Sequence, residues 1–510
     1  MKAMPAGNRA WPARMAAAAS PMWTAFVGSV LLSLIAIGTG GTLNRDGMLY
    51  VDTARVFLQG GFSAAREAFA WPFLPILMAV VSQATGLGLE NTGYLLNILF
   101  MAGACALLVA CAARLFPEAA WPICLVLLAT PGLNDYRNEV LREYGCWFFI
   151  MLSFWLALRW SAAPRWRSAL AVQAALGAAV LFRPEALAFF PALILWQLYE
   201  SPAGERWRRV LMIGGLPLIG LAILVALRAG GQLPGRLAGD LGRLSVARFD
   251  SKAQAIGAVL HEYAREQAHT ILFFGSLAII PLKFAKMMGV LLAPLFFPCV
   301  TQSGLRTVLA RSQIFAWAFV AHLLVLMVFV TDMQFLAGRY VALLTLLAVP
   351  PTGYGLWLLM QRFPRWKTAL VFVALLLMVS NAVTFAPGKR QYVEAGAWLA
   401  QNAKESPRIY IESARTAYYA GWRFAGRPEP ELRASLPEAL AQGQYDLVVL
   451  EVSRKDPDVA PWLEKAGLRE IKRFSHPNRD AVIVAEPLAG KNQDSASKTP
   501  RMRAKTGAIE

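Results

Sequence analysis

Two carboxylates lie in the polar stretch that follows the first long apolar run of the sequence. Asp46 and Asp52 are six residues apart within Asn44 to Gly61, NRDGMLYVDTARVFLQGG. An aspartate can take a proton from an acceptor hydroxyl, or it can help to hold a divalent cation such as Mg²⁺ or Mn²⁺. Aspartate is also a preferred N-terminal cap of helices. Asp46 therefore has a structural interpretation beside the catalytic or metal-binding one.

A second group of acidic residues stands in NDYRNEVLREYG, just before another apolar run. It contains Asp135, Glu139 and Glu143. Glu139 and Glu143 are candidate catalytic partners of Asp46, and Arg137, between Asp135 and Glu139, is a candidate phosphate ligand. The alternative is a solvated loop in which Arg and Glu side chains pair with one another, and surface pairs of that kind contribute about 0 to 1 kcal/mol.

Basic and aromatic side chains fall where the chain leaves the predicted bilayer on the same face. Arg183 in RPEAL and Arg339 in GRYVALL can each direct forked N–H donors toward a phosphate, and Tyr340 follows directly. Arg183 also fits a turn from which it reaches the lipid headgroups. Lys283 and Lys286 lie one turn apart in an apolar run, as interfacial anchors or as ligands of a lipid phosphate.

The composition is that of a membrane protein. Of 510 residues, 57% are hydrophobic and 16% are charged, and the mean hydropathy is +0.45, which is too apolar for a soluble enzyme. The net charge of +18 would suit nucleic-acid binding in a soluble protein, but Lys and Arg gather here in short loops between apolar runs, as membrane orientation requires. We therefore expect no nucleic-acid partner. The five cysteines form no CxxC pair, so neither a disulfide framework nor a zinc site is predicted.

The hydropathy pattern predicts about eleven transmembrane helices. The first, Met22 to Leu43, is long enough to cross about 30 Å of hydrocarbon, and the basic residues before it place the N-terminus in the cytoplasm. An odd number of crossings then puts the C-terminal part in the periplasm. The other crossings are predicted at residues 93–116, 121–133, 144–160, 168–182, 186–199, 210–227, once within 271–300, 314–330, 340–360 and 368–385.

External loops interrupt this pattern of crossings. The first, residues 44–71, contains a short amphipathic helix that is predicted to lie on the membrane face. Trp71 to Leu87 is apolar but broken by two prolines, which favours a further interfacial helix over a crossing. The long polar segment 228–270 is predicted to form an external loop that covers the substrate.

The composition changes to that of a soluble domain after residue 388, which ends the predicted transmembrane part, residues 1–388. Alternating strands and helices predict a small α/β domain over residues 389–488. The tail, residues 489–510, is rich in Lys, Ser, Gln and Gly and is predicted to be disordered. The strands are predicted at residues 408–412, 446–452 and 481–485, and the helices at residues 392–402 and 461–466.

Together, these segments resemble the type C (GT-C) membrane glycosyltransferase superfamily. The resemblance rests on an aspartate after the first crossing with Tyr50 behind it, on WPFLPILMAVVSQATGL (71–87), on RPEAL (183–187) and on GRYVALL (338–344). It is to the bacterial branch of the glycosyltransferase family 39 type, which includes the aminoarabinose transferases of lipid A and, more distantly, the protein O-mannosyltransferases.

This resemblance implies an integral enzyme of the bacterial inner membrane that moves a hexosyl or pentosyl group. The donor would be a polyprenyl-phosphate-linked sugar and the acceptor a lipid, a glycan or a protein, on the periplasmic face. Asp46 would be the catalytic or metal-associated carboxylate, and Tyr50, Arg339 and Tyr340 would bind substrate. Several relatives carry an acidic pair at this point, whereas Gly47 follows Asp46 here.

A transporter or flippase of a lipid-linked substrate is the alternative from another class. A transporter places ionisable groups near the middle of its spans and often contains broken helices in repeats. Here the charges gather at the outer ends of the predicted spans, and no internal repeat is evident. This distribution favours the enzyme. A non-catalytic assembly protein would leave the acidic loop without a function.

Overall fold

The chain folds into two compact units. One comprises Met1–Gly40 and Thr53–Phe385, and the other comprises Gly41–Asp52 and Ala386–Glu510. The start of the first external loop thus groups with the C-terminal part of the sequence. The tail predicted at 489–510, and residues 231–245 of the long predicted loop, lie outside the described residues. The structure is a computed structural model, and it describes residues 20–230, 246–383, 389–424, 435–453, 459–476 and 480–488.

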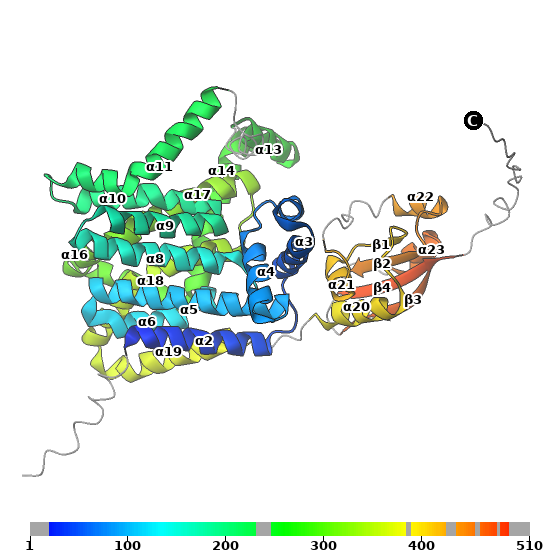
Figure 1. Cartoon of the computed structure of the whole chain (residues 1–510), viewed down its shortest axis with the longest axis horizontal. Helices are drawn as coiled ribbons and strands as arrows, with labels where there is room; N and C mark the ends of the chain where they lie inside the picture. The colour runs from blue at the N-terminus through cyan, green and yellow to red at the C-terminus, as the bar shows by residue number, and fades with distance from the viewer. Residues whose placement is uncertain are drawn as a thin grey trace, which may run out of the picture. The chain divides into compact units, whose positions relative to one another are not determined.

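The first unit is a bundle of helices, and Figure 1 shows most of its long helices running side by side. A helix satisfies its own backbone hydrogen bonds, which is what a chain surrounded by lipid requires. The helices described before residue 384, with 3-10 turns marked η, are α2 (Pro21–Thr39), α3 (Arg45–Ala68), α4 (Phe73–Thr85), α5 (Leu89–Leu115), η1 (Pro117–Ala119), α6 (Ala120–Ala129), α7 (Pro131–Asn134), α8 (Arg142–Ala162), α9 (Trp166–Phe182), η2 (Pro184–Ala188), α10 (Phe189–Glu200), α11 (Arg206–Ala229), α13 (Val246–Val259), η3 (Glu262–Gln267), α14 (Ala268–Met288), η4 (Gly289–Leu291), α15 (Leu292–Phe296), η5 (Phe297–Val300), α16 (Gln302–Arg311), α17 (Gln313–Met333), α18 (Gly338–Arg362), η6 (Pro364–Trp366) and α19 (Lys367–Ala382). The residues of α3 up to Asp52 belong to the second unit.

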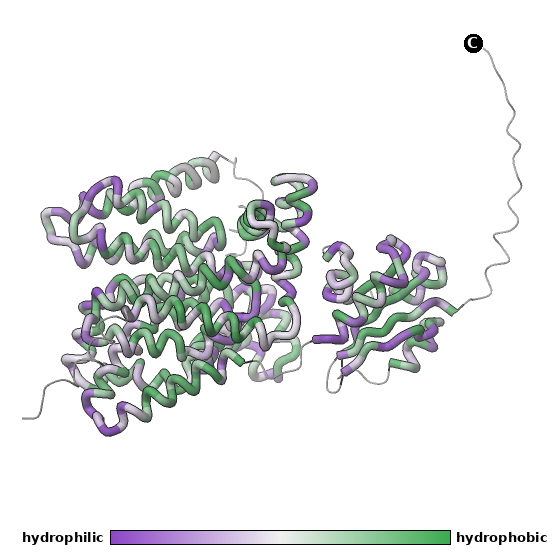
Figure 2. Tube along the Cα trace, turned by 60° about the horizontal axis from the view of Figure 1, so that its bottom comes forward, coloured by the Kyte–Doolittle hydropathy of each residue, from purple (hydrophilic) through white to green (hydrophobic). Residues whose placement is uncertain are grey.

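The bundle has the composition of a membrane domain. Each of the eleven segments predicted to cross the bilayer is helical, and Figure 2 shows these helices mainly hydrophobic along their length, with hydrophilic residues gathered toward their ends. The structure thus confirms a polytopic helical membrane protein. Within the described residues, seven segments are long and apolar enough to span a membrane by length and composition, namely Pro21–Thr39, Leu89–Leu115, Arg142–Ala162, Glu262–Val300, Gln313–Met333, Gly338–Arg362 and Pro364–Ala382.

Residues 44–71, which are predicted to form the first external loop, are largely helical, as α3 (Arg45–Ala68) shows. The Asn44 carbonyl accepts the first backbone hydrogen bond of α3, from the Met48 N–H at 3.0 Å. Asp46 therefore lies in the first turn of α3 rather than at its cap, and a carboxylate there interacts favourably with the positive end of the helix dipole. Gly61, at φ 71°, kinks α3 in a conformation that glycine adopts without a steric penalty.

The second unit contains a four-stranded mixed sheet in the order β1-β2-β4-β3. β1 and β2 are parallel, whereas β4 is antiparallel to both β2 and β3. Val449 of β2 packs with the core beside α20 and α21, while Val448 and Leu450 point to the other face, toward residues of α22 and α23. The predicted α/β domain is confirmed. Its elements are α20 (Arg390–Asn402), β1 (Ile409–Ile411), α21 (Ala414–Tyr419), α22 (Leu436–Ala441), β2 (Leu447–Val452), α23 (Ala460–Lys465), β3 (Leu468–Phe474) and β4 (Ala481–Pro487).

One strand of this sheet escaped prediction. β3, LREIKRF, is buried only at its first and last residues, and the five side chains between them are exposed. It lies at the edge of the sheet, where charged side chains discourage pairing with another chain. Such a strand lacks the apolar run that identified β1, β2 and β4.

Candidate active site

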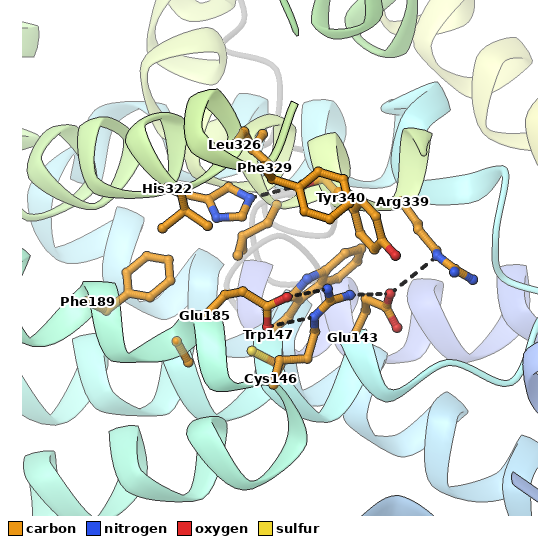
Figure 3. Close-up of a pocket in the computed structure, with 14 residues that line it drawn as sticks. Glu143, Cys146, Trp147, Glu185, Phe189, His322, Leu326, Phe329, Arg339 and Tyr340 are labelled. Atoms are coloured by element: carbon orange, nitrogen blue, oxygen red, sulfur yellow. Dashed lines mark hydrogen bonds and ion pairs between the residues drawn. The ribbon is translucent and has the colours of Figure 1, made fainter. Parts of the chain in front are cut away.

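A pocket opens at one end of the helical bundle, where α8 begins, α9 ends and α18 begins. It contains about 490 Å³ of space free of protein atoms, including its mouth. Figure 3 shows charged side chains on one side of it and aromatic and aliphatic side chains around the rest. The apolar walls include Trp147, Phe189, Val325, Leu326, Phe329 and Leu343.

Two arginines and two glutamates form the polar side of the pocket. Arg183 donates through Nη1 to Oε1 of Glu143 at 2.5 Å, and through Nη2 to Oε1 of Glu185 at 2.8 Å. Arg339 Nε lies 3.5 Å from the same oxygen of Glu143, whose side chain is 4% exposed. Glu143 thus bridges the two cations. The two positive and two negative charges balance, as buried charges require.

The local sequence explains how these charges meet. Arg183 ends α9 in an extended conformation because a residue before proline is disfavoured in the helix, and Pro184 then opens η2. That turn brings Glu185 back beside Arg183. Glu143 lies in the first turn of α8, and Arg339 is the second residue of α18. All four charged residues stand at helix ends, so none of them lies in the apolar middle of the bundle.

Tyr340 separates the charged side of the pocket from the apolar side. The Cζ atoms of Arg183 and Arg339 lie 4.7 Å and 5.3 Å from the centre of its ring, within the range of cation–π attraction. His322 Nε2–H donates to the Tyr340 carbonyl at 2.9 Å. Phe329 meets the Tyr340 ring edge to face. These contacts fix the Tyr340 ring between the cations and the apolar walls.

The carboxyl group of Glu185 has a pKa below its usual value. Burial opposes its ionisation, but the adjacent Arg183 guanidinium holds the pKa of Glu185 at about 2. A carboxylate whose pKa is depressed on folding stabilises the fold above its unfolded pKa of about 4.3. The stabilisation from this pair is therefore lost only as the pH falls through the interval from about 4 to about 2.

Tyr136 connects the acidic loop to the GRYVALL segment. The Arg339 backbone N–H donates to its hydroxyl, and burial, with the Asp135 and Glu139 carboxylates, raises the pKa of that hydroxyl. A Cβ atom at Gly338 would lie 2.2 Å from the hydroxyl oxygen. The absence of a side chain at Gly338 thus lets Tyr136 approach the backbone that carries Arg339.

Arg137 has protein partners in the interior of the bundle. It is 2% exposed, and its Nη1 donates to the Ser29 carbonyl and to the Ser29 and Ser33 hydroxyls at 2.9 to 3.0 Å. Its Nε donates to Asn134 Oδ1 at 2.6 Å. A charge at this depth turns to polar groups inside the bundle rather than to lipid. Of the described side chains, those that line the pocket do not include Arg137, Glu139, Lys283 or Lys286.

The segment that carries Asp46 and Tyr50 belongs to the second unit. Tyr50 is buried, and Asp52 lies 3.6 Å from Arg423 Nε through a carboxylate that is 2% exposed. Residues of the C-terminal sequence therefore hold the segment on which the proposed catalytic carboxylate stands. In the ranges that the structure describes, no group of three or more His, Cys, Asp or Glu side chains is arranged to hold a metal ion.

Several residues of the pocket were not predicted from the sequence. Glu185 carried a signal, because it stands two residues from Arg183 in RPEAL. His322 also carried a signal, since an ionisable residue within a predicted span suggests function. The four histidines are, however, scattered through the sequence, which does not indicate a shared site. Trp147, Phe189 and Phe329 gave no signal, because aromatic residues are common in every span of this chain.

Gly145→Ala is expected to destabilise the packing behind the charged cluster. A Cβ atom at Gly145 would lie 2.2 Å from the ring of Phe182, which is 1% exposed and precedes Arg183. Overpacking of this kind costs about 1 to 3 kcal/mol. Gly177→Ala on α9 is the matched control, because a Cβ there meets nothing within 4 Å. Thermal unfolding in detergent should show a lower midpoint for Gly145→Ala than for Gly177→Ala, and equal midpoints would contradict the packing argument.

The fold and the pocket define a multi-pass helical membrane protein with a small α/β domain and a charged site at the helix ends. No family model matches the sequence, and no curated protein matches it. The solved structures to which it is similar include an oligosaccharyltransferase and the protein ArnT.

Two of these solved structures illustrate the similarity. The Archaeoglobus fulgidus oligosaccharyltransferase, tethered to an acceptor peptide, aligns with a TM-score of 0.49 and 10% identity over 84% of this chain and 69% of its own. ArnT from Cupriavidus metallidurans, bound to undecaprenyl phosphate, aligns with a TM-score of 0.42 and 16% identity over 91% of this chain and 98% of its own.

Proposed function

We propose that this protein is an integral-membrane glycosyltransferase that uses a polyprenyl-phosphate-linked sugar as donor. The observation that carries the proposal is the pocket itself, which joins a two-arginine side to apolar walls. A polyprenyl phosphate has the same two parts, an anionic group and an apolar chain. A sugar on that phosphate would be held at the helix ends, where a lipid, glycan or protein acceptor can approach from water.

Arg339 is the cation that we assign to the donor phosphate. Arg183 forms close ion pairs with two carboxylates, and its side chain is 12% exposed. Arg339 lies 3.5 Å from Glu143, and its side chain is 25% exposed and so more accessible to a ligand. A guanidinium can place two N–H donors on a phosphate, and it would stabilise the charge that develops there as the sugar leaves.

The transfer is a single displacement at the anomeric carbon of the sugar. The acceptor hydroxyl oxygen attacks the anomeric carbon of the sugar, and the bond between that carbon and the phosphate oxygen breaks. The electron pair of that bond leaves with the polyprenyl phosphate. The acceptor proton passes to a general base, the role proposed for Asp46.

The donor-binding part of this proposal is tested with a polyprenyl phosphate and with the corresponding polyprenol, which lacks the phosphate. Arg339→Ala should weaken binding of the phosphate by roughly tenfold to a hundredfold, because a charge-assisted hydrogen bond is lost, and it should leave binding of the polyprenol unchanged. Fluorescence titration of the full-length protein in detergent measures both affinities.

Arg66→Ala is the matched control, because Arg66 is an exposed arginine of the first external loop and lies outside the pocket residues. Equal binding of the phosphate and the polyprenol by the unaltered protein would remove the assigned donor site. Translocation of the lipid-linked sugar across vesicles, without transfer to any acceptor, would instead favour the transporter.

A further inference from the structure

A second cavity lies at the opposite end of the bundle from the candidate active site. Glu143 at the start of α8 lines the first pocket, and Ser161 near its end lines the second. A helix of 21 residues is about 30 Å long, close to the hydrocarbon thickness of a bilayer. The second cavity contains about 1000 Å³ of space free of protein atoms, including its mouth.

Exposed tryptophans indicate that this cavity lies at the level of lipid headgroups. Trp121, Trp166, Trp207 and Trp366 are all exposed, and each stands beside a turn that joins two helices at this end of the bundle. Tryptophan rings concentrate at the interface between lipid and water. The cavity therefore opens where the polar parts of phospholipids lie.

The walls of the cavity carry two positive and two negative side chains. Arg311 Nη1 lies 2.6 Å from Oε1 of Glu118, so these two are paired with each other. Arg114 on α5 and Glu200 on α10 line the same cavity, and neither makes an ion pair or a side-chain hydrogen bond within the described part of the chain. One cation and one anion are thus left for a ligand.

We propose that this cavity binds the phosphoethanolamine headgroup of a membrane phospholipid. The phosphate pairs with Arg114, and the ammonium donates its N–H groups to Glu200. The lining of the cavity also includes the buried Trp196 and Ile314. A choline headgroup lacks the N–H donors, and a glycerol headgroup lacks the cation. This proposal does not depend on the glycosyltransferase function.

The two charges predict different lipid selectivities when each is removed. In titrations of the full-length protein in detergent with tail-labelled lipids, Arg114→Gln should weaken phosphatidylethanolamine and phosphatidylglycerol alike, by roughly tenfold for the loss of a charged hydrogen bond. Glu200→Gln should weaken phosphatidylethanolamine by a similar factor and leave phosphatidylglycerol unchanged. The unaltered protein should prefer phosphatidylethanolamine to phosphatidylcholine.

Arg159→Gln is the matched control, because Arg159 is exposed near the same end of α8, stacks on Trp155 and does not line the cavity. Competition with water-soluble glycerophosphoethanolamine distinguishes a site for the intact lipid from a site for the free headgroup. Only a site for the free headgroup would be blocked at glycerophosphoethanolamine concentrations near the Kd of the lipid. The proposal is overturned if Glu200→Gln leaves the selectivity between phosphatidylethanolamine and phosphatidylglycerol unchanged. It is also overturned if Arg159→Gln weakens binding of the two lipids as much as Arg114→Gln does.

Discussion

Arg183→Ala is expected to cost about 3 to 5 kcal/mol of folding free energy, because it removes one partner of a buried ion pair and leaves the other buried. The side chain of Glu143 is 4% exposed, so without Arg183 its charge is left largely desolvated, and Arg339 at 3.5 Å is a weaker partner. Unfolding in detergent by heat and by denaturant, followed by tryptophan fluorescence, measures the loss.

Arg311→Ala is the comparison, because Arg311 pairs with Glu118 at 2.6 Å in the same bundle and its side chain is 46% exposed, and exposed ion pairs contribute about 0.2 to 1 kcal/mol. Glu143→Gln should then cost less in the Arg183→Ala background than in the unaltered protein, since the two residues form one interaction. Additive losses would mean that the pair is not the unit that stabilises this end of the bundle.

Asp46→Asn is expected to lower turnover by roughly 10² to 10⁴ fold if Asp46 is the proposed general base. Because Asp46 lies in the first turn of α3 and Asn44 begins the helix, asparagine loses the interaction of the carboxylate charge with the helix dipole, which contributes about 0.3 to 1 kcal/mol. The loss of activity should therefore far exceed the loss of stability. Product formation by matched amounts of purified protein in lipid measures the first, and unfolding in detergent measures the second.

Glu67→Gln provides the matched control, since it neutralises an exposed acid at the other end of the same helix. If EDTA abolishes turnover and Mg²⁺ or Mn²⁺ restores it, the Asp46 carboxylate acts through a bound cation. Turnover near that of the unaltered protein in Asp46→Asn would take Asp46 out of the mechanism and direct attention to Glu143.

The helices were predictable because a bilayer imposes both a length and a composition on any segment that crosses it. The charged cluster was predictable only in part. The sequence predicted Glu143, Arg183 and Arg339 at helix ends on one face, but it also predicted Glu139 as a catalytic candidate and slightly favoured it over Glu143. Glu143 reaches the pocket because it stands in the first turn of α8, which follows the short helix α7. The position of that turn depends on contacts between helices, which the spacing of residues in the sequence does not reveal.

Arg137 is a residue for which the sequence suggested a ligand-binding role but the structure shows contacts inside the protein. Its position among acids in an external loop suggested a phosphate ligand, yet the structure turns its guanidinium to Ser29, Ser33 and Asn134. The two serines are four residues apart on α2 and share one face of that helix. A pair of serines in an apolar helix is a weak signal by itself, and its partner stands 108 residues further along the chain.

That separation has a consequence for how the protein is made. At the pace of translation, roughly 5 to 20 residues per second, Arg137 is synthesised about 5 to 20 s after Ser29. During that interval the first crossing presents its two hydroxyls without the guanidinium that they later receive. Insertion of α2 and its final packing are thus separate events in biogenesis, and the loop that bears Arg137 completes the second.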